Sequence, residues 1–156
     1  MAGKKKKEYP LIEGLEITTV AAEGKAMGRW NDIVVFVPMT VPGDIVDVQV
    51  RVKRRRFMEG TVVNYVRRSS IREEAFCEHF GICGGCKWQN LPYREQLRFK
   101  QEQVSDQLVR IGKLELPGIS PIIGSGKTRF YLHKLEYTFA PRRWLTYEAV
   151  ASGEAI

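Results

Sequence analysis

The nine residues IVDVQVRVK, at positions 45–53, alternate between apolar and polar side chains with a period of two. After Ile45, the apolar positions of the alternation are all valines, namely Val46, Val48, Val50 and Val52. The positions between them are polar, namely Asp47, Gln49, Arg51 and Lys53. Such alternation predicts a β-strand that presents one face to a hydrophobic core and the other face to water.

Turn signals divide the neighbouring residues into further short strands. The run DIVVFVP is rich in β-branched residues and stops at Pro38, while LEITTVAAEGKAMGRW begins as a strand and FMEGTVVNYVRR supplies another. Between them, VPGD at 41–44 fits a type II turn, because proline presets φ and glycine accepts a positive φ. Four or five short strands suit a small closed barrel without exposed edges. We therefore predict an OB-like barrel over residues 11–68.

Positive charge is concentrated in the second half of this predicted barrel. The whole chain has a formal net charge of +7, and residues 51–68 contain a single acid, Glu59. The basic residues of that segment are Arg51, Lys53, Arg54, Arg55, Arg56, Arg67 and Arg68. A cluster of this kind is typical of a nucleic-acid binder, so we predict that these side chains contact phosphates. Phe57 and Tyr65 lie in the same segment, and each either stacks on a base or fills the barrel.

All three cysteines of the chain fall within CEHFGICGGC, as Cys77, Cys83 and Cys86. The lysine run at 4–7 is not followed by an apolar signal segment, and no apolar run is long enough for a membrane helix, so we expect a cytoplasmic protein with no membrane partner. In a reducing compartment, clustered cysteines favour a metal site over disulfides. Zinc requires four ligands, and His79 would be the fourth beside the three cysteines. An iron–sulfur cluster requires four cysteines, so its fourth ligand would come from elsewhere.

One amphipathic helix is expected after the cysteines. Residues 69–91 have no regular pattern, whereas Asn90 is a candidate helix cap, Pro92 suits a first turn and Gly112 suits a helix end. An apolar stripe at helical spacing lies between the last two, formed by Tyr93, Leu97, Val104, Leu108 and Ile111.

The C-terminal residues predict the start of another sheet. The run RFYLHKLEYTFA, at 129–140, has the composition of a strand, and the sheet that it opens is not completed before Ile156. The motif GSGKT is not a phosphate-binding loop, because Pro121 stands where such a loop needs its first glycine. The residues themselves indicate no catalytic centre.

Two stretches of the sequence resemble parts of a known enzyme family. The segments G-K-x-x-G-R, F-V-P and V-P-G-D, in this order, resemble a TRAM domain, a small OB-like RNA-binding barrel. The run CEHFGICGGCKWQNLPYREQLRFKQEQV is similar to the cluster region of bacterial RNA uracil-5 methyltransferases of the 23S rRNA branch. The positions that match are Cys77, Cys83, Cys86, Gln89, Tyr93, Gln96, Leu97 and Lys100. Radical methylthiotransferases also carry TRAM domains, but their clusters use the spacing C-x3-C-x2-C, which is not found here.

The resemblance implies a [4Fe–4S] cluster held by Cys77, Cys83 and Cys86. The family's fourth cluster cysteine, its S-adenosylmethionine domain, its catalytic cysteine and its general base all correspond to positions beyond Ile156. Tyr131-Leu132-His133-Lys134 also stands where the family favours Tyr-Arg-Asn-Lys. The chain is therefore expected to be an N-terminal portion of such an enzyme, inactive alone, whose S-adenosylmethionine belongs to the full-length protein.

The expected organisation has four parts: a basic tail at 1–10, the TRAM barrel at 11–68, the cysteine loop at 69–91, and the helix with the beginning of a central domain at 92–156. The expected partners are 23S rRNA, contacted by the basic residues and Phe57, and a C-terminal methyltransferase chain or domain. The alternative is a freestanding RNA-binding module that holds zinc or a partial cluster and performs no catalysis.

Overall fold

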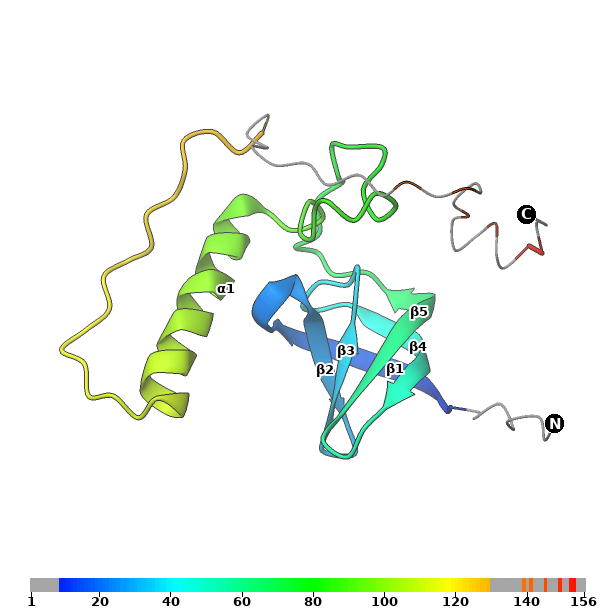
Figure 1. Ribbon diagram of the computed structural model, residues 1–156, viewed down its shortest axis with the longest axis horizontal. Coiled ribbons are helices and arrows are strands. Elements are labelled where there is room, and N and C mark those ends of the chain that lie inside the picture. Colours follow the sequence, from blue (N-terminus) through cyan, green and yellow to red (C-terminus); the bar gives the residue numbers. More distant parts are fainter. Residues whose placement is uncertain are drawn as a thin grey trace.

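The computed structural model describes residues 9–129 together with residues 139, 141, 145, 149, 152 and 153. The expected lysine tail and almost all of the expected strand at 129–140 lie outside the described residues. Five strands form one closed barrel in which β3 and β5 are parallel and the other neighbours are antiparallel (Figure 1). The strands are β1 (Leu11–Val20), β2 (Ala26–Trp30), β3 (Ile33–Val37), β4 (Ile45–Lys53) and β5 (Phe57–Arg67).

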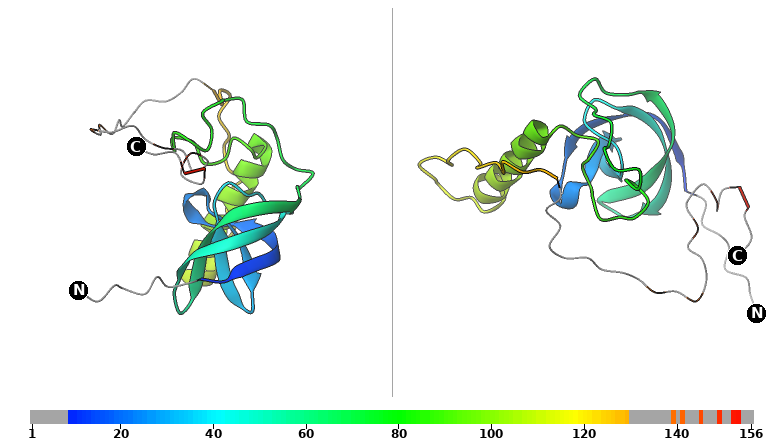
Figure 2. Two further views of the ribbon diagram at one scale, coloured as in Figure 1. Left: turned by 90° about the vertical axis from the view of Figure 1, so that its right-hand side faces the viewer. Right: turned by 90° about the horizontal axis from the view of Figure 1, so that it is seen from above.

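The order around the barrel is β1-β2-β3-β5-β4, and the last strand pairs with the first. Closure removes the unpaired sheet edges that five short strands would otherwise expose. The right-hand view of Figure 2 looks onto one end of this ring of strands. The predicted mainly β fold, with a small OB-like barrel followed by one helix, is confirmed.

The alternating strand supplies the centre of the core, as the sequence predicts. Val46, Val48 and Val50 of β4 are at most 1% exposed, whereas Val52, near the end of the strand, is half-buried. The other strands add apolar side chains to the same cluster: Ile12, Leu15, Ile17, Ala26, Val35, Val37 and Met58. Because these side chains lie inside a closed barrel, the intervening residues of each strand face outward.

Gly28 allows β1 and β2 to approach one another closely. It pairs with Ile17, beside an irregularity in β1. A Cβ at this position would lie 2.2 Å from the carbonyl oxygen of Glu16, which is inside any allowed contact. The second glycine of the G-K-x-x-G-R segment is therefore required by the packing of the barrel wall.

The helix α1 (Tyr93–Ser105) lies beside the barrel and continues into one turn of π-helix (Asp106–Ile111) before Gly112. Pro92, expected in the first turn, instead occupies the cap position directly before the helix, so the predicted cap at Asn90 is wrong. The Asn90 side chain instead donates a hydrogen bond to the carbonyl oxygen of Met39. Among the described residues, none belongs to a helix with the length and apolar character needed to cross a bilayer.

The predicted apolar stripe is not the face of the helix that packs against the barrel. The one helix residue in the core is Phe99, which is 3% exposed and packs with Val20, Val41 and Leu91. Within the stripe, Val104 is 46% exposed and Ile111 is 66% exposed. The prediction differs from the structure because Gln96 and Gln103 lie beside Phe99 on the face that contacts the barrel, where they donate hydrogen bonds to backbone carbonyl groups. A search for apolar residues at helical spacing excludes these polar positions.

Candidate functional site

The structure divides the predicted nucleic-acid-binding residues between opposite ends of β5. Four of them, at positions 53–56, are exposed at the last residue of β4 and in its connection to β5, and we call these four residues the basic turn. A backbone hydrogen bond of 2.9 Å from Arg54 to Phe57 closes this turn. Arg67 and Arg68 lie at the other end, roughly 30 Å further along a strand that rises about 3.3 Å per residue. The two groups therefore do not form one compact patch.

Arg51 and Phe57 accompany the basic turn. Arg51 is exposed on β4, and its Nε atom donates to the Thr61 hydroxyl at 3.3 Å. Phe57 precedes Met58, which is fully buried, so the Phe57 ring is on the outer surface of the barrel. Its nearest aromatic neighbour is Phe36 of β3, with ring centroids 5.9 Å apart at 66°. Of the two interpretations of Phe57, the structure favours an outward aromatic near the positive charge.

Sequence reasoning missed Phe36. It lies between Val35 and Val37, both fully buried, so its side chain points out of the barrel. The run DIVVFVP is apolar at outward and inward positions alike, and no alternation marks the outward ones. Only the presence of a large aromatic in a half-buried strand could have suggested it.

Tyr65 belongs to the structure of the barrel rather than to an open surface. It packs against the core cluster, and its hydroxyl donates to the carbonyl oxygen of Met39 at 3.2 Å. The guanidinium groups of Arg68 and Arg72 lie 4.9 and 5.0 Å from the centre of its ring. Burial raises the pKa of Tyr65 above its usual value, so the phenol remains a hydrogen-bond donor. The interpretation of Tyr65 as a barrel residue is the one that the structure favours.

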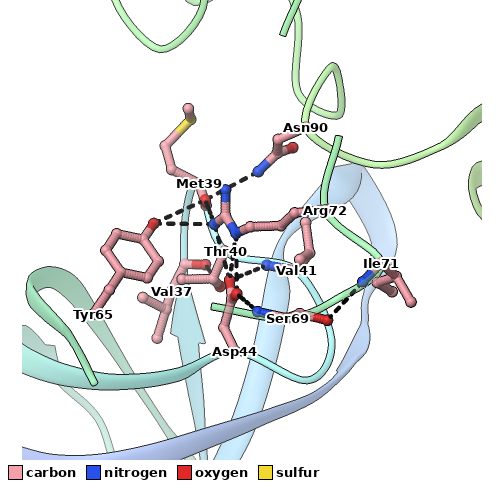
Figure 3. A network of polar contacts seen from close by, with 10 residues as sticks. All are labelled: Val37, Met39, Thr40, Val41, Asp44, Tyr65, Ser69, Ile71, Arg72 and Asn90. Atoms are coloured by element: carbon pink, nitrogen blue, oxygen red, sulfur yellow. Dashed lines mark hydrogen bonds and ion pairs between the residues drawn. The ribbon is translucent and has the colours of Figure 1, made fainter. Parts of the chain in front are cut away.

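A buried ion pair joins the barrel to the segment that follows it (Figure 3). Asp44 is fully buried and accepts hydrogen bonds from the backbone N–H groups of Val41 and Ser69, both at 2.8 Å. The Arg72 guanidinium donates to the same carboxylate at 2.9–3.2 Å. Burial acts to lower the pKa of Arg72, but the hydrogen bonds and charge of Asp44, with Tyr65, outweigh it and raise that pKa. Arg72 therefore stays charged and hydrogen-bonded to the Asp44 side chain.

The carbonyl oxygen of Met39 is the meeting point of this network. Met39 has a positive φ of 66°, and its oxygen accepts from Arg72 at 2.8 Å and from Asn90 at 3.1 Å, as well as from Tyr65. The donors Arg72 and Asn90 are 33 and 51 positions from Met39 in the sequence, and they share this one acceptor. The start and the end of segment 69–90, which carries the cysteines, are both attached to the same barrel loop.

Two glutamines that match the methyltransferase-like motif of the sequence hold the ends of the cysteine segment in place. Gln89 accepts a hydrogen bond from the backbone N–H of Cys77 at 3.2 Å, and Gln96 donates to the carbonyl oxygens of Trp88 and Leu91 at 3.0 and 2.8 Å. Trp88 in turn covers the loop between β1 and β2. A Cβ at Gly24 in that loop would lie 2.5 Å from the Trp88 indole nitrogen. These contacts hold both ends of the segment between Cys77 and Trp88.

The three thiols themselves do not converge. Cys77 and Cys86 are half-buried, Cys83 is exposed, and turns at Gly81 and Gly84 separate them, each with a positive φ. Among the described residues, no three His, Cys, Asp or Glu side chains are grouped to hold a metal ion. The donor types suit zinc or an iron–sulfur cluster, but their positions do not form a preassembled site. A loop with few apolar contacts of its own often gathers its ligands only when a metal binds.

Comparison with known proteins identifies the barrel and relates most of the chain to one class of enzyme. The TRAM domain family matches residues 11–63. An uncharacterized RNA methyltransferase of Bacteroides thetaiotaomicron is 56% identical over 131 residues, which are 84% of this chain and 29% of that protein. The 23S rRNA (uracil(1939)-C(5))-methyltransferase RlmD of Francisella tularensis subsp. novicida is 34% identical over 136 residues, which are 85% of this chain and 30% of that protein.

Among solved structures, the tRNA (uracil-54, C5)-methyltransferase of Pyrococcus abyssi, in complex with S-adenosyl-L-homocysteine, matches with a TM-score of 0.41 and 28% identity. The match covers 61% of this chain and 21% of that one. The chain thus spans less than a third of the length of each of these relatives.

Proposed function

Because this chain carries a TRAM domain and is similar to RNA methyltransferases over most of its length, we propose that it is the RNA-binding N-terminal portion of an S-adenosylmethionine-dependent rRNA uracil-C5 methyltransferase. The observation that carries this proposal is the basic turn, which presents four exposed cations at one end of a TRAM barrel. Such charges neutralise phosphates and release counterions, and this release drives binding. The similarity to RlmD favours 23S rRNA as the substrate.

This proposal assigns a role to each part of the whole protein. Residues 11–68 bind RNA, residues 69–91 form the cysteine segment, and residues from 92 onward begin a central domain. When bound, S-adenosylmethionine supplies the methyl group. We assign its binding site and the catalytic residues to the part of the relatives' length that this chain does not span. The residues of this chain position the RNA and leave the chemistry to that part.

The dependence of RNA affinity on salt tests the proposal. We expect the logarithm of the association constant to fall linearly with the logarithm of salt concentration, with a slope of about −3 for four phosphate contacts on a single strand. Fluorescence anisotropy with a labelled fragment of 23S rRNA, between about 50 and 200 mM salt, measures this slope. A slope near zero would remove the electrostatic basis of the proposal.

We further propose that Cys77, Cys83 and Cys86 ligate a [4Fe–4S] cluster in the complete enzyme. The family-like spacing and the fixed ends of the loop, held by Gln89 and Gln96, support it. In this proposal the cluster holds together a loop that has few apolar contacts of its own, because the free energy of metal binding stabilises the folded loop.

Metal analysis after anaerobic purification tests the cluster proposal. We expect iron and sulfide together, with loss of both when Cys83 and Cys86 become serine, and hydrogen exchange in residues 77–86 that slows when the cluster is present. Zinc without iron would instead support the alternative, a freestanding RNA-binding module with a zinc site. Methyl transfer to uracil-containing rRNA by the isolated chain would contradict the view that the catalytic part lies elsewhere.

A further inference from the structure

Cys83 and Cys86 are separated in the sequence by two glycines only. The backbone turns at Gly84, which has a positive φ of 73°, a conformation that glycine adopts without strain. The Cys83 sulfur lies 3.7 Å from the position that a Cβ of Gly85 would take, so this thiol is directed along the chain toward Cys86. The two glycines thus turn the chain and put no side chain between the two thiols.

Cys77 is attached to a different part of the fold. Its backbone N–H donates to the Gln89 side chain at 3.2 Å, and its carbonyl oxygen accepts from the N–H of Phe80 at 3.0 Å. The next turn is closed by a hydrogen bond of 3.2 Å from the N–H of Cys83 to the carbonyl oxygen of His79. A disulfide from Cys77 would have to span these turns, whereas a disulfide between Cys83 and Cys86 closes a ring outside them.

Loop length and exposure favour the same pair of thiols. A disulfide between Cys83 and Cys86 closes a loop of four residues, whereas pairing Cys77 with one or the other closes seven or ten. Chain entropy alone therefore favours the shortest loop by about twofold over the seven-residue loop and about fourfold over the ten-residue loop. Cys83 is exposed and Cys86 is half-buried, so an oxidant in solution reaches Cys83 first.

We propose that Cys83 and Cys86 are a site of reversible oxidation, which forms a disulfide when the cysteine segment holds no metal. The oxidant is a small-molecule disulfide such as glutathione disulfide. The Cys83 sulfur attacks one sulfur of glutathione disulfide, which gives a mixed disulfide and releases one glutathione thiol. The Cys86 sulfur then attacks the Cys83 sulfur, closes the protein disulfide and releases the second glutathione thiol. The two released glutathione molecules carry the two protons and two electrons that the cysteine pair loses, and Cys77 stays a free thiol.

Oxidation of this pair competes with metal binding, a consequence that rests on the proposed function. The disulfide occupies two of the three cysteines that we propose as cluster ligands, and cysteine binds metal as a thiolate. The oxidised segment therefore lacks the ligands for iron, and reduction by glutathione restores both. Conversely, bound metal protects the pair from glutathione disulfide.

Alkylation of the full 156-residue chain tests the disulfide. The chain is freed of metal by a chelator under reducing conditions and transferred into glutathione disulfide. Its free thiols are then blocked with N-ethylmaleimide and located by fragmentation in a mass spectrometer. We expect three blocked cysteines before oxidation and one afterwards. Cys77 should be the blocked one in at least about four-fifths of the oxidised molecules, compared with roughly 60% from loop length alone. In concentrated urea, which removes the attachment of Cys77 to Gln89, this share should fall to the lower value.

Single serine variants are the matched controls. Cys77→Ser should form the disulfide as the parent does, whereas Cys83→Ser and Cys86→Ser should retain glutathione as a mixed disulfide. A blocked position that follows loop length alone, equally with and without urea, would overturn the proposal. A parent chain that only accumulates glutathione adducts would overturn it as well.

The metal content of the chain separates the disulfide from the cluster proposal. The anaerobically purified chain, with its iron and sulfide measured, is treated with glutathione disulfide beside the chelator-treated chain. We expect the iron-containing chain to resist oxidation and the chelated chain to form the disulfide. A chain that is purified without iron and still forms the disulfide would contradict the cluster and support the oxidation site. A chain that contains iron but forms no disulfide after chelation would contradict the oxidation site and leave the cluster proposal standing.

Discussion

Replacing Asp44 by alanine should lower the free energy of unfolding of the chain by about 3–5 kcal/mol, the usual cost of removing one partner of a buried ion pair. The substitution leaves the Arg72 guanidinium and the backbone N–H groups of Val41 and Ser69 without their acceptor. Since small domains are stable by only about 5–15 kcal/mol, this loss is a large fraction of the total. Urea unfolding followed by circular dichroism measures it.

Asp47→Ala is the matched control for this experiment. Asp47 is three residues further along the chain, and it also accepts a backbone and a side-chain hydrogen bond, from Gly14 at 2.8 Å and from Asn64 at 2.9 Å. Its carboxylate faces solvent, so water replaces the lost partners and the expected cost is below about 1 kcal/mol. If Asp44→Ala and Asp47→Ala unfold at the same urea concentration, the buried network does not stabilise the barrel.

The substitution Asp44→Ala should also affect the dynamics of the cysteine segment. Arg72 and Asn90 are both attached to the barrel at the carbonyl oxygen of Met39, and Asp44 holds Arg72 in position. With the Asp44 carboxylate removed, we expect faster hydrogen exchange at residues 69–90, and a smaller increase in the strands of the barrel. The hydrogen bonds of Asp44, Arg72 and Asn90 thus connect the barrel, which we propose binds RNA, to the loop that we propose holds the cluster.

The barrel could be predicted from sequence because its information is local. In β4, each valine and each polar residue is assigned to a face by the period of the strand alone, and the structure buries three of the four valines, Val46, Val48 and Val50. Pro42 and Gly43 mark the turn before it in the same local way. The basic turn was equally visible, since four consecutive cations are a property of the chain and not of its packing.

Features that depend on distant contacts could not be predicted in this way. The partner of Asp44 is 28 residues away, and nothing in the pattern around Arg72 identifies it as the partner. The sequence did predict β5, as the run FMEGTVVNYVRR, but grouping the charges by their position along the chain overlooked that this strand separates Arg67 and Arg68 from the basic turn. The helix face was misassigned because hydrophobic spacing selects apolar residues, whereas the real contact uses Gln96 and Gln103 beside Phe99.

The cysteine segment shows a different limit. Its spacing and its resemblance to a cluster loop are clear in the sequence, yet the described residues hold no grouped set of ligands. Gln89 and Gln96 explain why the motif extends beyond the cysteines, because they bond the backbone at both ends of the loop. Sequence therefore identified the residues of the segment, and the structure assigns to the glutamines a role that spacing alone did not indicate.

Removing the basic turn should have the largest effect on RNA binding. When Lys53, Arg54, Arg55 and Arg56 are all replaced by alanine, we expect the slope of log affinity against log salt to fall in magnitude by about 2.8, at roughly 0.7 for each phosphate contact on a single strand. At 0.1 M salt the same contacts correspond to a loss of affinity of at least about a hundredfold. Anisotropy titrations with the labelled rRNA fragment measure both quantities.

A second variant with the same change in net charge distinguishes contact from overall attraction. Lys87, Arg94, Arg110 and Lys127 are exposed cations outside the barrel strands, and replacing these four by alanine removes the same charge. Salt screens charges more than about 10 Å from the bound strand, so this variant should keep most of the parent's slope and affinity. Equal losses in the two variants would mean that the chain attracts RNA through its net charge, and the basic turn would then have no special role. A further loss on replacing Arg67 and Arg68 would extend the path of the RNA along the whole of β5, toward the cysteine segment.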